Sequence, residues 1–242
     1  MPSHLKENTK GMTAGKWYSQ WFTGSLTNIN FYEILPNHNY PFLLTENERQ
    51  ATLASIIGDG YMYKGNAQSK YPRIAWNMGN KKHAEYKKDF FFRFGSTIQE
   101  KENPGWGSKW YCVTTKSCPA FVEIFDKYNK KDKALRAELV MPELKEIGWA
   151  WLYGDDGHFD KKNGIAYIHT EGLEEEGTKI AAKCLGAFLE IDQPISVQKY
   201  LGGYPKKERF CLRLKKNETK EFITRIKKNM ADGLEYKTSF CN

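Results

Sequence analysis

The feature that most constrains this 242-residue chain is an internal repeat. Around Asp59 the sequence reads TENERQATLASIIGDGYMYKG, and around Asp156 it reads MPELKEIGWAWLYGDDGHFDKKNG. Each copy is an apolar, helix-like segment that ends at an acidic residue followed by glycine, and an alternating strand comes next. Such a recurrence indicates two structural units with a common architecture.

The same order of elements is predicted after each motif. Period-2 alternation and 3.6-residue periodicity after Asp59 predict strands at 61–64 and 73–78, a helix at 81–94, a strand at 109–115 and a helix at 119–128. After Asp156 they predict strands at 158–162 and 165–170, a helix at 173–190, strands at 195–200 and 209–215, and a helix at 220–229. The fold class is therefore α+β, with two pseudo-symmetric αββαββα repeats.

Helix-start signals set the limits of the two repeats. Thr45 and Glu48 form the pattern of a capping box, and Pro142 suits a first helical position. We therefore expect a first repeat at 45–141 and a second at 142–242. Residues 1–44, which are aromatic and turn-rich without clear periodicity, form an N-terminal extension of undetermined role.

Composition narrows the class of partner. The formal net charge of +8 and the pI of about 9.0 favour a polyanion. The five cysteines are odd in number and lack C-x-x-C spacing, which favours reduced thiols in an intracellular compartment and argues against a zinc site. No apolar run reaches membrane-spanning length, so no membrane is expected as a partner. An organelle (mitochondrion or chloroplast), a phage and a bacterial host are not distinguished.

The copies TLASIIGDG and WAWLYGDDG resemble the signature of the LAGLIDADG homing endonucleases, in the single-chain, two-repeat form that introns encode. The resemblance covers about residues 45–242. It implies an antiparallel, saddle-like sheet in each repeat, a two-helix interface between the repeats, and a monomer with pseudo-twofold symmetry. The implied activity is metal-dependent hydrolysis of both strands at a long, asymmetric site in double-stranded DNA.

The resemblance also implies the catalytic carboxylates, Asp59 and Asp156. These two would bind the metal, together with the preceding Gly58 and Asp155. Mg²⁺ suits such hard oxygen ligands, and Mn²⁺ is an alternative. Small residues at Ala54 and Gly58 would let the first motif helix approach its partner closely.

The second motif leaves its register open. Its small pair, Ala150 and Gly154, precedes Asp155, so alignment on small residues selects Asp155. Alignment on Asp-Gly selects Asp156, which we prefer because single-chain members of the family often carry Asp-Asp-Gly in this copy.

Basic residues are expected beside the carboxylates, since the family places one near each to support water activation or the charged transition state. The resemblance assigns this catalytic role to Lys133, shortly before the second motif, and to Lys237 near the C-terminus. Each of these is also one among many lysines, so an ordinary surface position is the competing interpretation.

The predicted sheets would lie in the major groove of DNA, as other β-ribbon readers do. Basic, polar and aromatic side chains on the strands are expected to contact bases and phosphates. The candidate DNA-binding residues, expected to alternate outward, are Lys64, Arg73, Trp76, Asn77, Lys109, Lys161, Lys199 and Arg213. An ordinary solvated sheet face is the competing interpretation for each of them.

The sequence is also compatible with two other functions. One is an intron maturase that binds RNA, because a basic, aromatic surface serves RNA equally well. The other is a DNA-binding protein without cleavage. A polymerase is disfavoured, because YGDD here follows a helix-like segment and is duplicated. The sequence does not identify the target DNA or the host intron.

Overall fold

The computed structural model describes residues 43–65, 69–102, 109–202 and 206–239. The chain divides into two units, Met1–Pro41 and Phe42–Asn242, and every described residue belongs to the second. The predicted N-terminal extension at 1–44 therefore lies almost entirely outside the described residues. Among the described residues, no helix is long and apolar enough to cross a membrane.

The first repeat has the predicted αββαββα order of elements, and it includes one strand of the second hairpin for which the sequence patterns predict no residue range. This strand, β3, pairs with β4 along its whole length, although it is polar and exposed. A charged edge strand of this kind lacks the alternation that strand prediction relies on. The elements are α4 (Glu46–Ile57), β1 (Gly60–Lys64), β2 (Pro72–Met78), α5 (Lys81–Phe90), β3 (Thr97–Glu102), β4 (Lys109–Thr114) and α6 (Val122–Tyr128).

The second repeat follows the same plan. Its elements are α8 (Glu146–Asp156), β5 (Gly157–Asp160), β6 (Ile165–His169), α9 (Glu174–Phe188), β7 (Ser196–Gly202), β8 (Lys207–Leu214) and α10 (Lys216–Ile226). The predicted α+β fold of two αββαββα repeats is confirmed. Pro142 does not begin the motif helix: it lies in the 3-10 turn Met141–Glu143, and α8 starts at Glu146.

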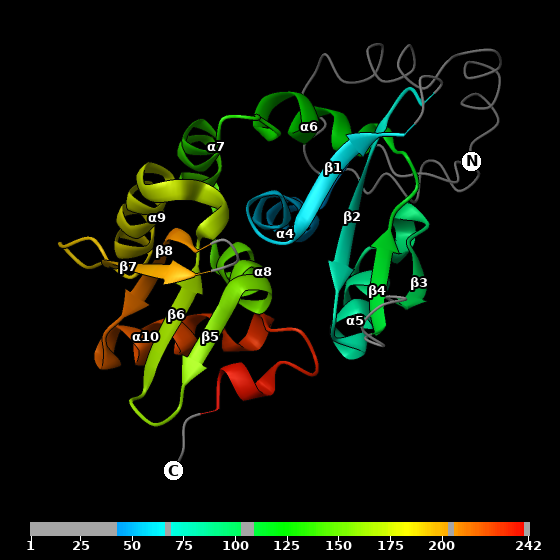
Figure 1. The fold of residues 1–242 in the computed structure, drawn as a ribbon. Helices are drawn as coiled ribbons and strands as arrows, with labels where there is room; N and C mark the ends of the chain where they lie inside the picture. Colours follow the sequence, from blue (N-terminus) through cyan, green and yellow to red (C-terminus); the bar gives the residue numbers. More distant parts are fainter. Residues whose placement is uncertain (1–42, 66–68, 103–108, 203–205, 240–242) are drawn as a thin grey trace, which may run out of the picture. The chain divides into compact units, whose positions relative to one another are not determined.

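Both sheets are four-stranded and antiparallel with equivalent strand orders, β1-β2-β4-β3 and β5-β6-β8-β7. Figure 1 shows the first sheet in cyan to green and the second in yellow-green to orange. Gly60 opens β1 opposite Trp76, and Gly157 opens β5 opposite Ile168. These two pairs define equivalent positions in the two repeats.

One additional helix connects the repeats. Helix α7 (Lys133–Val140), which the sequence patterns did not predict, packs against α9 of the second repeat. A Cβ placed on Gly177 would lie 3.4 Å from the Cβ of Ala137, an ordinary van der Waals distance, so the two helices are in direct contact at this glycine. The first repeat is thus packed onto the second through α7 as well as through the motif helices.

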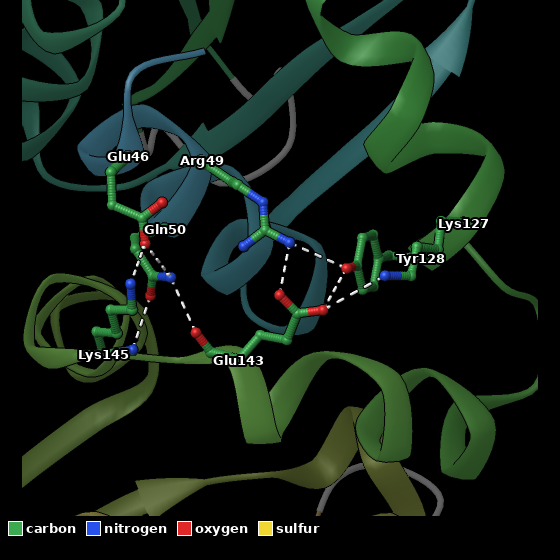
Figure 2. Close-up of polar contacts among 7 residues, drawn as sticks. All are labelled: Glu46, Arg49, Gln50, Lys127, Tyr128, Glu143 and Lys145. Atoms are coloured by element: carbon green, nitrogen blue, oxygen red, sulfur yellow. Dashed lines mark hydrogen bonds and ion pairs between the residues drawn. The ribbon is translucent and has the colours of Figure 1, made fainter. Parts of the chain in front are cut away.

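The motif helices α4 and α8 pack against each other, and their starts are joined by a polar network (Figure 2). Thr45 and Glu48 form the predicted capping box at the start of α4. Gln50 is almost fully buried; its Oε1 accepts from the Lys145 backbone N–H at 2.7 Å, and its Nε2 donates to the Glu143 carbonyl at 2.8 Å. The side chain of Gln50 therefore satisfies an unpaired backbone donor at the start of α8.

A charged pair extends this network to α6. Arg49 Nη2 lies 2.5 Å from Glu143 Oε2 and 3.0 Å from the Tyr128 hydroxyl, which itself donates to Glu143 (Figure 2). Burial alone would raise the pKa of the Glu143 carboxyl, but the hydrogen bonds from Tyr128 and Arg49 and the charges of Arg49 and Lys127 hold this pKa below its usual range. The starts of the two motif helices are thereby fixed to the segment that joins the repeats.

Candidate active site where the two motif helices end

The far ends of α4 and α8 also meet, so the two helices run parallel. A Cβ placed on Gly58 would lie 2.9 Å from Asp156 Oδ2 and 3.3 Å from Asp155 Oδ2. Real side chains essentially never make the first of these contacts, so a side chain at position 58 would displace the Asp156 carboxylate. The glycine of the first motif therefore permits the close approach of the second-motif carboxylates.

Asp59 and Asp156 occupy equivalent positions. Each immediately precedes the glycine that opens the first strand of its sheet. In this register Asp155 corresponds to Gly58, the position of closest approach. The geometry thus pairs Asp156, not Asp155, with Asp59.

The surroundings of the two equivalent aspartates differ. Asp59 is exposed, whereas Asp156 is half-buried. Burial, followed by the negative charges of Asp59 and Asp155, raises the pKa of the Asp156 carboxyl to about 8. The carboxylates of Asp59 and Asp155 thus lie near enough to Asp156 to repel its negative charge, and the cations Lys87 and Lys237 do not compensate this repulsion.

Asp155 has a cationic partner of its own. Its Oδ1 lies 2.5 Å from Lys87 Nζ and 3.6 Å from His83 Nε2, and the Asp155 and Lys87 side chains are both fully buried. Burial lowers the pKa of Lys87 and raises that of Asp155, while each charge opposes the shift of the other. Burial, then the charges of Lys87 and Lys237, lowers the pKa of His83 to about 2, so His83 is neutral. The side chain of Asp155 is committed to Lys87 rather than presented to a metal through Oδ1.

Lys87 comes from the first repeat and lies between two tryptophans. Its Nζ is 5.3 Å from the ring centroid of Trp76 and 5.0 Å from that of Trp151, so one ring from each repeat stabilises the buried cation. Trp76 is fully buried, and its Nε1 donates to the Ser55 hydroxyl at 2.9 Å. The prediction that Trp76 contacts DNA is therefore wrong: it faces the helices because its parity on β2 matches that of Ile74.

Lys237 does lie beside the motif, as predicted. Its Nζ donates to the Gly154 carbonyl at 2.7 Å, with the carbonyls of Tyr153 and Asp155 at 3.4 Å. Burial lowers the pKa of Lys237, against the attraction of all three aspartates. A cation at the C-terminal end of a helix is also favoured by the helix dipole, so Lys237 stabilises α8 and faces the carboxylate cluster at once.

Lys133 does not reach the motifs. Its Nζ pairs with Glu174 at 3.1 Å, and its side chain is 44% exposed, since it lies in the first turn of α7 and points to solvent. Lys133 is therefore placed as a surface residue, contrary to the expected catalytic position.

Arg136, one turn later on α7, takes the position expected for Lys133. Its Nη1 donates to the Ile56 carbonyl at 3.2 Å. Ile56 stands three residues before Asp59, as Tyr153 stands three residues before Asp156. Arg136 is thus the structural counterpart of Lys237, and each motif helix has one cation on its final carbonyls.

The donor set fits a divalent cation. Asp59 and Asp156 offer hard carboxylate oxygens, and the raised pKa of Asp156 marks uncompensated negative charge. Within the described ranges, no three His, Cys, Asp or Glu side chains form a metal site by themselves. Phosphate oxygens and water would have to complete the coordination shell, as Mg²⁺ sites on nucleic acid substrates require.

The outward face of the first sheet is polar and aromatic. Register and alternation place Arg73 and Asn77 on this face. Arg73 lies over the ring of Tyr63, and Lys101 of β3 lies over the ring of Trp110. Lys101 is not among the DNA-binding residues predicted from the sequence. Such cation–aromatic rows suit phosphates and base edges.

Three of the predicted DNA-binding lysines, Lys64, Lys109 and Lys199, occupy strand positions on the opposite face of their sheets. Lys64 pairs in register with buried Pro72 and lies over the Phe125 ring of α6. Lys109 and Lys199 are exposed but paired with Glu100 and Glu208, at 2.6 and 2.5 Å. The expectation that these three alternate outward is wrong, because their strand positions share the face of the core residues.

The second sheet repeats the arrangement. Arg213 faces outward, opposite Tyr167 and Ser196 in register. Lys161 lies exposed in the turn between β5 and β6. Arg73, Asn77, Lys161 and Arg213 are thus positioned on or beside the faces predicted to meet DNA, and their contacts with DNA stay a prediction.

The chain belongs to the LAGLIDADG DNA endonuclease family, whose sequence model matches residues 49–223. Its fold is similar to that of the homing endonuclease I-WcaI bound to its DNA recognition sequence, with a TM-score of 0.68, 16% identity, and coverage of 92% of this chain and 98% of that chain. A comparison with curated protein sequences finds no match.

Two further structures align less well. Full-length DUF199/WhiA from Thermatoga maritima gives a TM-score of 0.47 at 12% identity, over 82% of this chain and 60% of that chain. I-DmoI in complex with DNA and Ca gives 0.43 at 14% identity, over 75% and 89%. Neither score is high enough to add to the fold assignment.

Proposed function

We propose that this protein is a site-specific endonuclease that cuts both strands of a long, asymmetric DNA site by Mg²⁺-dependent hydrolysis. The observation that carries the proposal is the convergence of Asp59 and Asp156 at the ends of a parallel helix pair, beneath equivalent strands of two sheets. Family membership and the fold support the same activity.

Each residue of the cluster has a part in this reaction. Asp59 and Asp156 would hold the cation, which when bound lowers the pKa of water and stabilises charge on the phosphate. Lys237 and Arg136 donate to the carbonyls at the motif-helix ends, and so keep the two carboxylates at their positions. Lys87 neutralises Asp155 within the interface.

The two repeats differ in sequence along both outward faces, so the two half-sites should differ as well. A symmetric dimer would instead read a palindrome. One chain supplies both motifs, and we propose that it acts as a monomer.

The test is selection of cleaved duplexes from a randomised library with Mg²⁺, with parallel reactions in Ca²⁺ or EDTA. We expect one asymmetric consensus, cut on both strands with Mg²⁺ and uncut with EDTA. The double variant Asp59→Asn/Asp156→Asn is the matched control. Cleavage by this control, recovery of palindromes only, or no cleaved DNA at any salt concentration would contradict the proposal.

A further inference from the structure

A cavity of about 220 Å³ adjoins both motif carboxylates. One wall comes from the end of the first motif and includes Asp59, and the other comes from the second repeat and includes Asp156, His169 and Thr170. The volume far exceeds the roughly 10–15 Å³ that one water molecule needs. Because two proposed metal ligands line it, this is where an attacking water and a phosphate oxygen would meet.

His169 is the imidazole side chain in this wall. It ends β6 and is half-buried, its Nδ1 lies 3.3 Å from the Tyr200 hydroxyl, and the two rings pack edge to face at 6.3 Å. Tyr200 comes from β7, so two strands of the second sheet together fix the position of the His169 ring in the cavity wall.

The first repeat has an amide at the equivalent position. Asn77 follows Trp76, which faces Gly60, as His169 follows Ile168, which faces Gly157. Asn77 is exposed. A neutral amide does not take up a proton near neutral pH, whereas an imidazole does. The two halves of the site therefore offer different chemistry at one register position.

We propose that His169 is a catalytic residue that accepts the proton of the attacking water at one of the two scissile phosphates. This inference rests on the proposed nuclease function. The water oxygen forms a bond to phosphorus as its proton passes to His169, the P–O ester bond breaks, and the departing oxygen takes a proton from solvent. His169 then returns its proton to bulk water. Asp59 and Asp156 remain available as metal ligands throughout.

The assignment makes the reaction unequal on the two strands. His169 can serve only the phosphate that enters its own cavity, and the strand opposite the Asn77 position must rely on solvent to accept the proton. A positioned proton acceptor contributes roughly 10²–10⁴-fold to a rate. Loss of His169 should therefore slow cleavage of one DNA strand by about a hundredfold and leave cleavage of the other strand near its original rate.

The experiment measures single-turnover cleavage of a duplex labelled on each strand, with His169→Ala, His169→Gln and the matched control Asn77→Ala. We expect both His169 variants to accumulate nicked DNA with one specific strand intact. Added imidazole should accelerate His169→Ala on that strand by about tenfold and leave Asn77→Ala unchanged. His169→Gln keeps the volume and a hydrogen-bonding group, so it tests the proposal if the alanine variant folds poorly.

Equal slowing of both strands, wild-type rates in His169→Gln, or no response of His169→Ala to imidazole would overturn the assignment. DNA affinity and thermal unfolding are measured alongside, and we expect both to stay close to wild type. A wild-type protein that fails to cleave under the same conditions would instead refute the proposed function itself.

Discussion

The two motif ends have the same place in the fold and different chemistry. In the first, Gly58 precedes an exposed Asp59 and leaves room for its partner. In the second, Asp155 takes the place of Gly58 and brings an additional buried carboxylate, which Lys87 of the first repeat neutralises across the interface. The comparison shows that the repeats are not interchangeable: the second motif contributes most of the buried charge, and the first contributes the space and the counter-ion.

The largest effect should come from the equivalent carboxylates. Asp59→Asn or Asp156→Asn removes a proposed metal ligand, and we expect single-turnover cleavage to fall by about a thousandfold or more, comparable to the upper range for loss of one electrostatic group. DNA affinity should stay within about tenfold, because phosphate contacts supply most binding. Gel-shift and cleavage assays on one substrate measure both; loss of binding in each variant would make the aspartates structural caps.

The next largest effect should come from breaking the buried Lys87–Asp155 pair, which joins the two repeats. Lys87→Met leaves the Asp155 charge unpaired and Asp155→Asn leaves Lys87 unpaired, and breaking one side of a buried pair costs about 3–5 kcal/mol. The double variant Lys87→Met/Asp155→Leu should recover much of this loss, since no buried charge remains. Denaturant unfolding gives the three free energies.

The exposed pair Lys109–Glu100, at a similar distance of 2.6 Å, is the matched control, and Lys109→Met should change stability little. If Lys87→Met were as stable as this control, the two repeats would not be held together as described.

Substitutions of Lys237 and Lys133, the two lysines predicted from the sequence to be catalytic, should differ clearly in their effect on the cleavage rate. Lys237→Met removes the cation beside Gly154 and should slow cleavage by about a hundredfold, with the salt dependence of binding almost unchanged. Lys133→Met should stay within about twofold of wild type, because its side chain pairs with Glu174 on the surface. Single-turnover rates measure this; equal defects in the two variants would contradict the placement of Lys133.

A further prediction concerns pH. The folded-state pKa of Asp156, about 8, is above the ordinary value of 3.8, so its contribution to stability is fully present below pH 4 and is lost as pH rises toward 8. In EDTA the wild type should therefore lose stability relative to Asp156→Asn between pH 5 and 8, and Mg²⁺ with DNA should reverse the trend. Thermal unfolding across this range gives the difference, and parallel curves for the two proteins would argue against the raised pKa.

Local patterns were sufficient to predict the duplicated architecture and the position of both motif aspartates. They were not sufficient for groups whose role depends on tertiary contacts. Lys87 shares a helix face with buried His83 and Ala84, which is the signal that was available, but only the approach of the second motif shows why a lysine is tolerated there. Polar strand β3 carried no comparable signal.

Two errors have simple geometric causes. Lys133 was selected by its distance from the motif along the sequence, yet it begins α7 and points to solvent, and the residue that reaches the first motif is Arg136 one turn later. Strand alternation alone predicts that Trp76 faces outward, but on β2 its side chain lies on the same face as buried Ile74 and packs against Trp151 of the other repeat. Each error concerns which face of a helix or strand packs against the rest of the protein, and composition alone does not show that.

The central claim is that Asp59 and Asp156, one from each repeat, hold a divalent cation between them while Asp155 does not. A crystal structure of the DNA complex with Mn²⁺, with the ion located by its anomalous scattering, tests this directly. We predict a peak within coordination distance of carboxylate oxygens of both Asp59 and Asp156, with Asp155 Oδ1 still paired with Lys87. A peak bound by Asp155 and not by Asp156, or one that contacts only a single repeat, would contradict the account.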